Sequence, residues 1–207
     1  MLLDADDCQL VLVDYPTRLM PVIFENERVI ANAVRLTRMA QVLQVPVWGT
    51  EQTPDKLGAN VQEVDSAIEA AGGRILKKSH FSAMAAGLGQ WLRPPARPVS
   101  MGGNVRSLPK HLRKPVTEPE ADKNTLVIAG CEAHVCLLQT ALELLDDDYE
   151  VWVVTDACSS RTERNRDAAF DRLAGNGAEL VTTEMVAFEW LRSAEHPAFK
   201  ELLGLIK

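Results

Sequence analysis

Three side chains of the sequence could together perform nucleophilic chemistry: the thiol of Cys136, the carboxylate of Asp14 and the ammonium of Lys78. Cys136 is predicted in the first turn of an apolar helix, where free N–H groups and the helix dipole lower the pKa of a thiol and can bind an oxyanion. Asp14 could accept the thiol proton, and Lys78 could stabilise a carboxylate and a thiolate. The alternatives are an inert buried cysteine, an aspartate that caps backbone groups and a surface lysine.

A parallel sheet is predicted to hold these residues. Short apolar runs predict strands at 9–13, 45–49, 74–77, 125–129, 151–155 and 178–182. Amphipathic spacing predicts helices at 26–44, 61–71, 135–145 and 163–174, and a helical tail from 185 that is interrupted near 196–197. This alternation predicts a three-layer α/β/α, Rossmann-like fold with a central, mostly parallel sheet of about six strands. Ligands bind at the carboxyl ends of such strands, where Asp14, Lys78 and Cys136 all fall.

Length and composition indicate one soluble globular domain over 1–207. The net charge of −7 argues against nucleic acid as a partner. No segment is apolar for long enough to span a membrane. The first seven residues carry three aspartates, where a signal peptide would carry positive charge, so the chain is expected in the cytoplasm. The four cysteines lack the spacing of a zinc site and are predicted to be free thiols.

One segment, at about 93–123, breaks the alternation of strands and helices. It holds six of the eleven prolines and a Gly102-Gly103 pair, and it is locally basic. It is predicted to be a Pro-rich insertion. Its role is open between a solvated excursion and a lid or subunit contact.

The sequence resembles the isochorismatase-like cysteine hydrolases, and more closely the branch of isochorismatase-domain-containing proteins. The resemblance covers nearly the whole chain except the Pro-rich insertion. The matching segments are 13–14 (VD) with Arg18 and Pro21, 50–52 (TEQ) with 57–58 (LG), 78–82 (KSHFS), 130–136 (GCEAHVC), 140–145 (TALELL), 156–161 (DACSSR) and 196–200 (HPAFK).

The resemblance implies a catalytic triad of Asp14, Lys78 and Cys136. It also implies a cis peptide between Cys131 and Glu132 and an oxyanion hole formed by the N–H groups of Glu132 and Cys136. Amidase-like members form a thioester from an amide, whereas isochorismatase members cleave a vinyl ether. The family also implies a homo-oligomer that acts on a small-molecule substrate. Residues expected to line the substrate pocket are Tyr15, Trp48, His80, Phe81 and His134. The alternative for His80 is a buried structural histidine, and the alternative for His134 is a residue that only satisfies the turn.

Two departures from the family pattern limit this assignment. Pro16 stands where much of the family has glutamine, so a polar contact in the pocket is lost or replaced. The histidine and aspartate metal ligands of the nicotinamidase branch are not visible, so neither a catalytic metal nor another cofactor is expected. The leading prediction is a metal-independent cysteine hydrolase acting on a C–N (amide) bond, or on an ester or vinyl ether. The alternatives are an inactive oligomeric scaffold on the same fold and a thiol redox protein.

Overall fold

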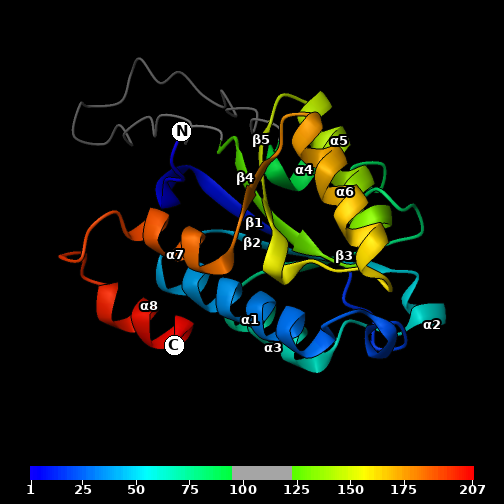
Figure 1. Ribbon diagram of the computed structural model, residues 1–207, viewed down its shortest axis with the longest axis horizontal. Coiled ribbons are helices and arrows are strands. Elements are labelled where there is room, and N and C mark those ends of the chain that lie inside the picture. The colour runs from blue at the N-terminus through cyan, green and yellow to red at the C-terminus, as the bar shows by residue number, and fades with distance from the viewer. Residues whose placement is uncertain (95–122) are drawn as a thin grey trace, which may run out of the picture.

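A six-stranded parallel sheet forms the centre of the computed structural model, which describes residues 1–94 and 123–207 (Figure 1). The strand order is β3-β2-β1-β4-β5-β6, and every neighbouring pair is parallel. The strands are β1 (Cys8–Val13), β2 (Val47–Gln52), β3 (Arg74–Lys78), β4 (Thr125–Gly130), β5 (Glu150–Val154) and β6 (Glu179–Val181). The predicted fold class is confirmed, and each predicted strand is present with ends shifted by at most a few residues.

Helices cover both faces of the sheet. Figure 1 shows α1, α3, α7 and α8 on one face and α5 and α6 on the other. The helices are α1 (Asn26–Val42), α2 (Pro54–Leu57), α3 (Gln62–Ala70), α4 (Gly89–Leu92), α5 (Leu138–Asp146), α6 (Glu163–Gly175), α7 (Thr183–Leu191) and α8 (Phe199–Ile206). Short turns of 3-10 helix are η1 (Ala5–Asp7), η2 (Met20–Val22) and η6 (Thr155–Ala157), and η5 (Ala133–Leu137) is a π-helical turn.

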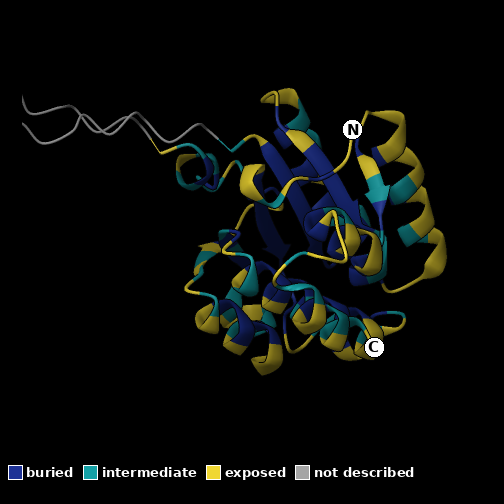
Figure 2. Cartoon of the chain, turned by 90° about the vertical axis from the view of Figure 1, so that its left-hand side faces the viewer, coloured by how far each residue is buried: buried dark blue, intermediate teal, exposed yellow. Residues whose placement is uncertain are grey.

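The two central strands, β1 and β4, are buried at all six positions, because helices cover them on both sides (Figure 2). Their runs of Val, Leu and Ile are typical of such doubly covered parallel strands. Burial of each of these side chains contributes roughly 1.5–3 kcal/mol. One polar residue, Gln9, is satisfied: its amide donates to the carbonyls of Leu92 and Lys123 and accepts from Trp48 Nε1.

The carboxyl ends of β1 and β4 approach each other closely. Gly130 ends β4, and a Cβ at this position would collide with the carbonyl oxygen of Val13. The next amide, that of Cys131, donates to the same oxygen at 2.9 Å. The glycine therefore allows the chain after β4 to pass directly beside Asp14, at the point where strand order reverses.

The expected Pro-rich insertion lies almost entirely outside the described residues. In the two described ranges, no helix is long and apolar enough to cross a membrane.

Candidate active site

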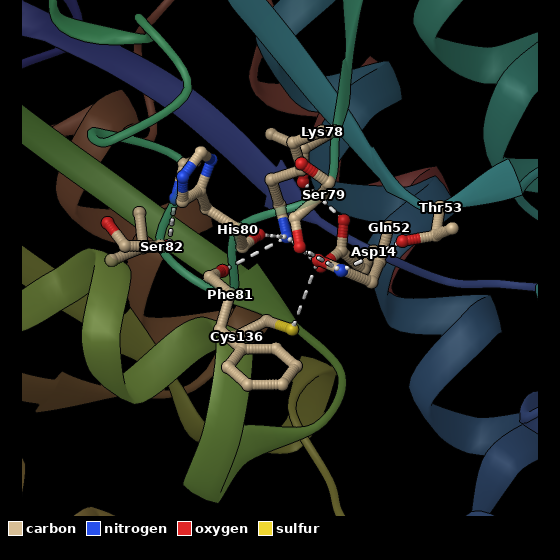
Figure 3. Close-up of polar contacts among 12 residues, drawn as sticks. Asp14, Gln52, Thr53, Lys78, Ser79, His80, Phe81, Ser82 and Cys136 are labelled. Carbon is tan, nitrogen blue, oxygen red and sulfur yellow. Dashed lines mark hydrogen bonds and ion pairs between the residues drawn. The ribbon is translucent and has the colours of Figure 1, made fainter.

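A buried ion pair lies at the carboxyl edge of the sheet. Lys78, the last residue of β3, places Nζ 2.6 Å from Oδ2 of Asp14, which follows β1 (Figure 3). The two side chains are 0% and 1% exposed. Asp14 adopts a left-handed backbone conformation with φ of 50°, which turns the chain sharply at the end of the strand. The structure thus brings together two residues that are 64 positions apart in the sequence.

Two residues of β2 complete the polar contacts of this pair. Thr50 Oγ1 donates to Asp14 Oδ1 at 2.6 Å, and Gln52 Oε1 accepts from Lys78 Nζ at 2.6 Å. The Gln52 amide nitrogen donates to the carbonyl of Ser79, so the orientation of the amide is fixed. Sequence analysis did not single out Thr50 or Gln52 as site residues. The available signal was two polar residues, spaced by two, at the end of an otherwise buried strand.

Lys78 has more acceptors than protons. Besides Asp14 and Gln52, the carbonyl oxygens of Phe81 and His80 lie 3.0 and 3.3 Å from Nζ. Four acceptors around a group with three N–H bonds engage all of its donors. Lys78 is therefore held in one position beside Asp14.

Cys136 lies at the same edge, 6% exposed, with Sγ 3.9 Å from Gln52 Oε1 (Figure 3). It belongs to the π-helical turn η5 that precedes α5, rather than to an α-helical first turn. The expectation of a lowered thiol pKa is wrong. Burial, and after it the Asp14 carboxylate, raise the pKa of Cys136, Lys78 only partly opposes them, and together these effects raise the pKa to about 12. The resting thiol is protonated.

The turn that carries the thiol is fixed by the segment after β5. The peptide between Cys131 and Glu132 is cis, as expected. The Ala133 amide donates to the Ser159 carbonyl at 2.7 Å, and Arg161 Nε donates to Glu132 Oε1 at 2.8 Å. His134 Nδ1 also lies 2.9 Å from Ser160 Oγ. Residues 159–161 thus hold both Glu132 and the start of η5.

Two residues expected in the substrate pocket lie elsewhere. Tyr15 is fully buried and its hydroxyl donates to the Ala157 carbonyl, so it belongs to the core. Trp48 lies near the amino end of β2, where its ring faces Trp91 at 5.8 Å between centroids. Both predictions failed for a geometric reason: proximity in sequence to Asp14, or to the end of a strand, does not specify the direction of a side chain.

Two of the other three pocket candidates, His80 and Phe81, lie at the ion pair, and the third, His134, lies on the turn that carries Cys136. His80 and Phe81 are exposed and direct their carbonyl oxygens at Lys78, and Phe81 is 53% exposed. His134, half-buried, contacts Ser160 and lies 4.0 Å from Glu132. Among the residues the structure describes, no group of three or more His, Cys, Asp or Glu side chains is arranged to hold a metal ion. A groove of about 780 Å³ lies elsewhere, along α1.

Comparisons with known proteins agree with this architecture. The model of the isochorismatase domain matches residues 110–185. Isochorismatase domain-containing protein 2A of Mus musculus is 32% identical over 198 residues, which cover 96% of this chain and 82% of the mouse protein.

Among solved structures, that of the MAR1 ribonuclease from Caenorhabditis elegans has a TM-score of 0.82 and 27% identity, and covers all of this chain and 92% of its own. The ycaC gene product of Escherichia coli, described as an octameric hydrolase of unknown specificity, has a TM-score of 0.73. It is 21% identical, with coverage of 99% of this chain and 95% of its own, and thus shows the fold alone. With a mouse relative matched over most of both chains, the protein belongs to the isochorismatase domain family.

Proposed function

We propose that the protein is a metal-independent cysteine hydrolase that cleaves a C–N (amide) bond of a small molecule through a thioester intermediate. The observation that carries this proposal is the buried Lys78–Asp14 pair at 2.6 Å, with Cys136 at the same strand edge. Such a pair supplies a carboxylate base that is held in place and a compensating charge beside a thiol.

In the first half-reaction one proton moves twice, from the thiol to Asp14 and then from Asp14 to the leaving group. Asp14 takes the thiol proton as Sγ of Cys136 attacks the substrate carbonyl carbon, and the oxyanion accepts hydrogen bonds from the N–H groups of Glu132 and Cys136. Collapse of the tetrahedral adduct breaks the C–N bond. The proton on Asp14 passes to the leaving nitrogen, which departs as an amine or ammonia. The acyl group remains on Cys136 as a thioester.

The second half-reaction reverses these roles. Asp14 takes a proton from water as the water oxygen attacks the thioester carbon, and the C–S bond breaks. The acid leaves, and the proton returns to the Cys136 thiolate. Thr50 holds one oxygen of Asp14 while the other faces Lys78, so the carboxylate keeps one orientation through both steps. Pro16 replaces the family glutamine, and we propose that the Gln52 amide, which contacts Lys78 and lies 3.9 Å from Cys136 Sγ, supplies the polar contact instead.

A second candidate is a catalytically inactive scaffold on the same fold. The raised pKa of Cys136 favours it, because a thiol that ionises near 12 is almost entirely protonated at neutral pH. The hydrolase instead requires that substrate binding bring the electrophile and the Asp14 base to the thiol together. The two candidates therefore differ in whether Cys136 acquires an acyl group.

The test is acyl transfer to the intact protein. Wild-type protein is mixed with p-nitrophenyl acetate and with a panel of small primary amides, and intact mass and ammonia release are followed. We expect an acetyl adduct on Cys136, absent in Cys136→Ser, and turnover of at least one amide. Cys158→Ser, which removes a buried thiol, is the matched control and should acylate normally. If Cys136 stays unmodified and no amide is turned over, the hydrolase is ruled out and the inactive scaffold remains.

An RNA arm belongs in the same experiment because the C. elegans structure is described as a ribonuclease. We predict no cleavage of a labelled single-stranded RNA, since the net charge of −7 disfavours binding of phosphates.

We also propose that the chain acts as a single domain, as a homo-oligomer and in the cytoplasm. The four free cysteines support the last point, because thiols remain reduced there.

A further inference from the structure

Asn60, in the segment between α2 and α3, is a polar residue that is almost fully buried, with an exposed fraction of 4%. Every polar atom of its side chain has a partner. Oδ1 accepts a hydrogen bond from the Tyr15 amide at 2.7 Å. Nδ2 donates to the Thr50 carbonyl at 3.2 Å and to Asp65 Oδ1 at 3.0 Å. The side chain thus joins three parts of the fold: the chain after β1, the end of β2, and α3.

The two backbone contacts lie directly next to residues of the candidate active site. The Tyr15 amide belongs to the peptide that follows Asp14, and the Thr50 carbonyl belongs to the peptide that follows Thr50. The side chains of Asp14 and Thr50 are themselves joined, at 2.6 Å between Oδ1 and Oγ1. The parallel pairing of β1 with β2 extends to Val13 and Thr50, so it stops one residue before Asp14. The Asn60 amide therefore continues the connection between the two chains beyond their last strand pair.

Asp14 needs this support because its backbone is left-handed, with φ of 50°. Residues other than glycine disfavour that conformation, so neighbouring contacts must hold it. The bond from Asn60 holds the peptide that comes next. When the bond is removed, the N–H of this peptide loses its acceptor and the peptide can rotate, which displaces the Asp14 carboxylate from the Cys136 thiol.

The segment around Asn60 does not depend on the side chain for its own position. Its backbone pairs with the chain after β1: Thr17 N–H donates to the Ala59 carbonyl at 2.9 Å, and Val61 N–H donates to the Tyr15 carbonyl at 2.8 Å. These backbone bonds remain available in a variant that lacks the amide. We therefore expect the segment to stay in place when the side chain is shortened.

The partners of Asn60 require a neutral amide. The Tyr15 N–H needs an acceptor, whereas the Thr50 carbonyl and the Asp65 carboxylate need donors. A second carboxylate is also close, because Glu51 Oε1 accepts from the backbone N–H of Asn60 at 3.1 Å. A carboxylate at position 60 would keep the acceptor, lose both donors and bring like charges together.

We propose that Asn60 is a positioning residue, whose side-chain amide holds the peptide after Asp14 against the end of β2 and thereby aligns the Asp14 carboxylate with the Cys136 thiol. Asn60 acts through Asp14 rather than on the substrate. This inference rests on the proposed hydrolase function, because the alignment matters only if Asp14 accepts the thiol proton.

The test is the rate at which p-nitrophenyl acetate acylates Cys136 between pH 7 and 9, followed by intact mass on the full chain. With Asp14 aligned, the wild-type rate should be nearly independent of pH. Asn60→Ala should acylate about tenfold to a hundredfold more slowly at pH 7. Its rate should also rise about tenfold per pH unit, because a thiol with a pKa of about 12 and no aligned base reacts only after solvent ionises it.

Asn60→Asp separates alignment from stability. It keeps the acceptor for the Tyr15 amide, so its acylation rate should stay close to that of the wild type, with the same flat pH profile. It should nevertheless melt at a lower temperature, because the new carboxylate meets that of Asp65. Activity in the two Asn60 variants should therefore not follow their stability.

Asn32→Ala is the matched control. Asn32 is also a buried asparagine, 5% exposed, whose amide donates to the Asp156 carbonyl and accepts from Arg35, both at 2.8 Å. The control variant should lose stability, as measured by circular dichroism melting, and keep both the rate and the pH profile of the wild type.

Two results would overturn the proposal: acylation of Asn60→Ala with the rate and flat profile of the wild type, or rates that fall in proportion to stability in all three variants. If Asn60→Ala does not fold, Asn60→Ser takes its place, because a serine hydroxyl is too short to reach the Tyr15 amide. A wild type that is not acylated at Cys136, or whose rate rises with pH as in Asn60→Ala, would instead refute Asp14 as the base, and with it this role of Asn60.

Discussion

Replacement of Asp14 and replacement of Lys78 should change the reactivity of Cys136 in opposite directions. Burial is the largest cause of the raised pKa of Cys136, and the Asp14 carboxylate is the next, while Lys78 lowers this pKa. Asp14→Asn removes the charge that opposes a thiolate and leaves Lys78 in place. Lys78→Met removes the charge that favours it. The first variant should therefore lose hydrolysis yet alkylate faster, whereas the second should lose both.

The size of the effect follows from the ionisation of the thiol. At pH 8 a thiol with a pKa of about 12 is ionised in about one molecule in ten thousand. A fall of one pKa unit raises the thiolate fraction tenfold, but a less basic thiolate is a weaker nucleophile, so the alkylation rate rises roughly threefold to fourfold. A neighbouring charge shifts a pKa by about 1–3 units. Asp14→Asn should therefore alkylate roughly threefold to sixtyfold faster.

The assay is the rate of iodoacetamide labelling between pH 7 and 10, with each cysteine mapped by mass spectrometry. Thermal melting controls for stability, because breaking a buried ion pair costs roughly 3–5 kcal/mol. Cys8, with its pKa raised to about 11 by burial, serves as an internal reference in every variant. Labelling of Cys136 that slows in Asp14→Asn, or that rises in both variants, would refute the electrostatic reasoning from the pair.

Three further substitutions test the supports of the site. Gly130→Ala should destabilise the protein by about 1–3 kcal/mol or more in urea unfolding, because the new Cβ collides with the Val13 carbonyl, and a neutral result would contradict that close approach. Arg161→Ala should slow acylation of Cys136 about tenfold while changing stability by less than about 1 kcal/mol, since the Arg161 side chain is 56% exposed; stopped-flow and melting data separate the two. Burial raises the pKa of Cys131 from 9.0 to about 12, so its contribution to the free energy of unfolding is full below pH 9 and is lost as pH rises toward 12. Cys131→Ala should therefore reduce the alkaline slope of the unfolding free energy by about 1.4 kcal/mol per pH unit between pH 9 and 11. An unchanged slope would show that the thiol ionises equally in the folded and unfolded states.

The fold was predictable because its periodicity is strong. The buried strands β1 and β4 read as continuous apolar runs, and α1 shows a clear helical spacing, so both element type and order follow from the sequence. The rule that ligands bind at the carboxyl ends of strands then placed Asp14, Lys78 and Cys136 at one edge.

The details of the site were less accessible, because they depend on register and burial. Gln52 reaches Lys78 only because β2 and β3 pair with these two residues in register, which the sequence does not encode locally. The direction of the Cys136 pKa shift was predicted wrongly. The prediction considered the helix dipole, which lowers the pKa, but not burial, which raises it by more. Tyr15 and Trp48 were misplaced because side-chain direction depends on the packed core.

The contacts around Lys78 limit how many protons can be transferred in one step of the reaction. Its three N–H bonds are all engaged by the four oxygens described above, so releasing one would break a contact with Asp14, Gln52 or a backbone carbonyl. In the proposed mechanism every proton transfer then passes through Asp14, one proton at a time. We therefore expect the turnover rate, measured in mixtures of H2O and D2O, to fall linearly with the deuterium fraction. A linear plot indicates that a single proton is transferred in the rate-limiting step.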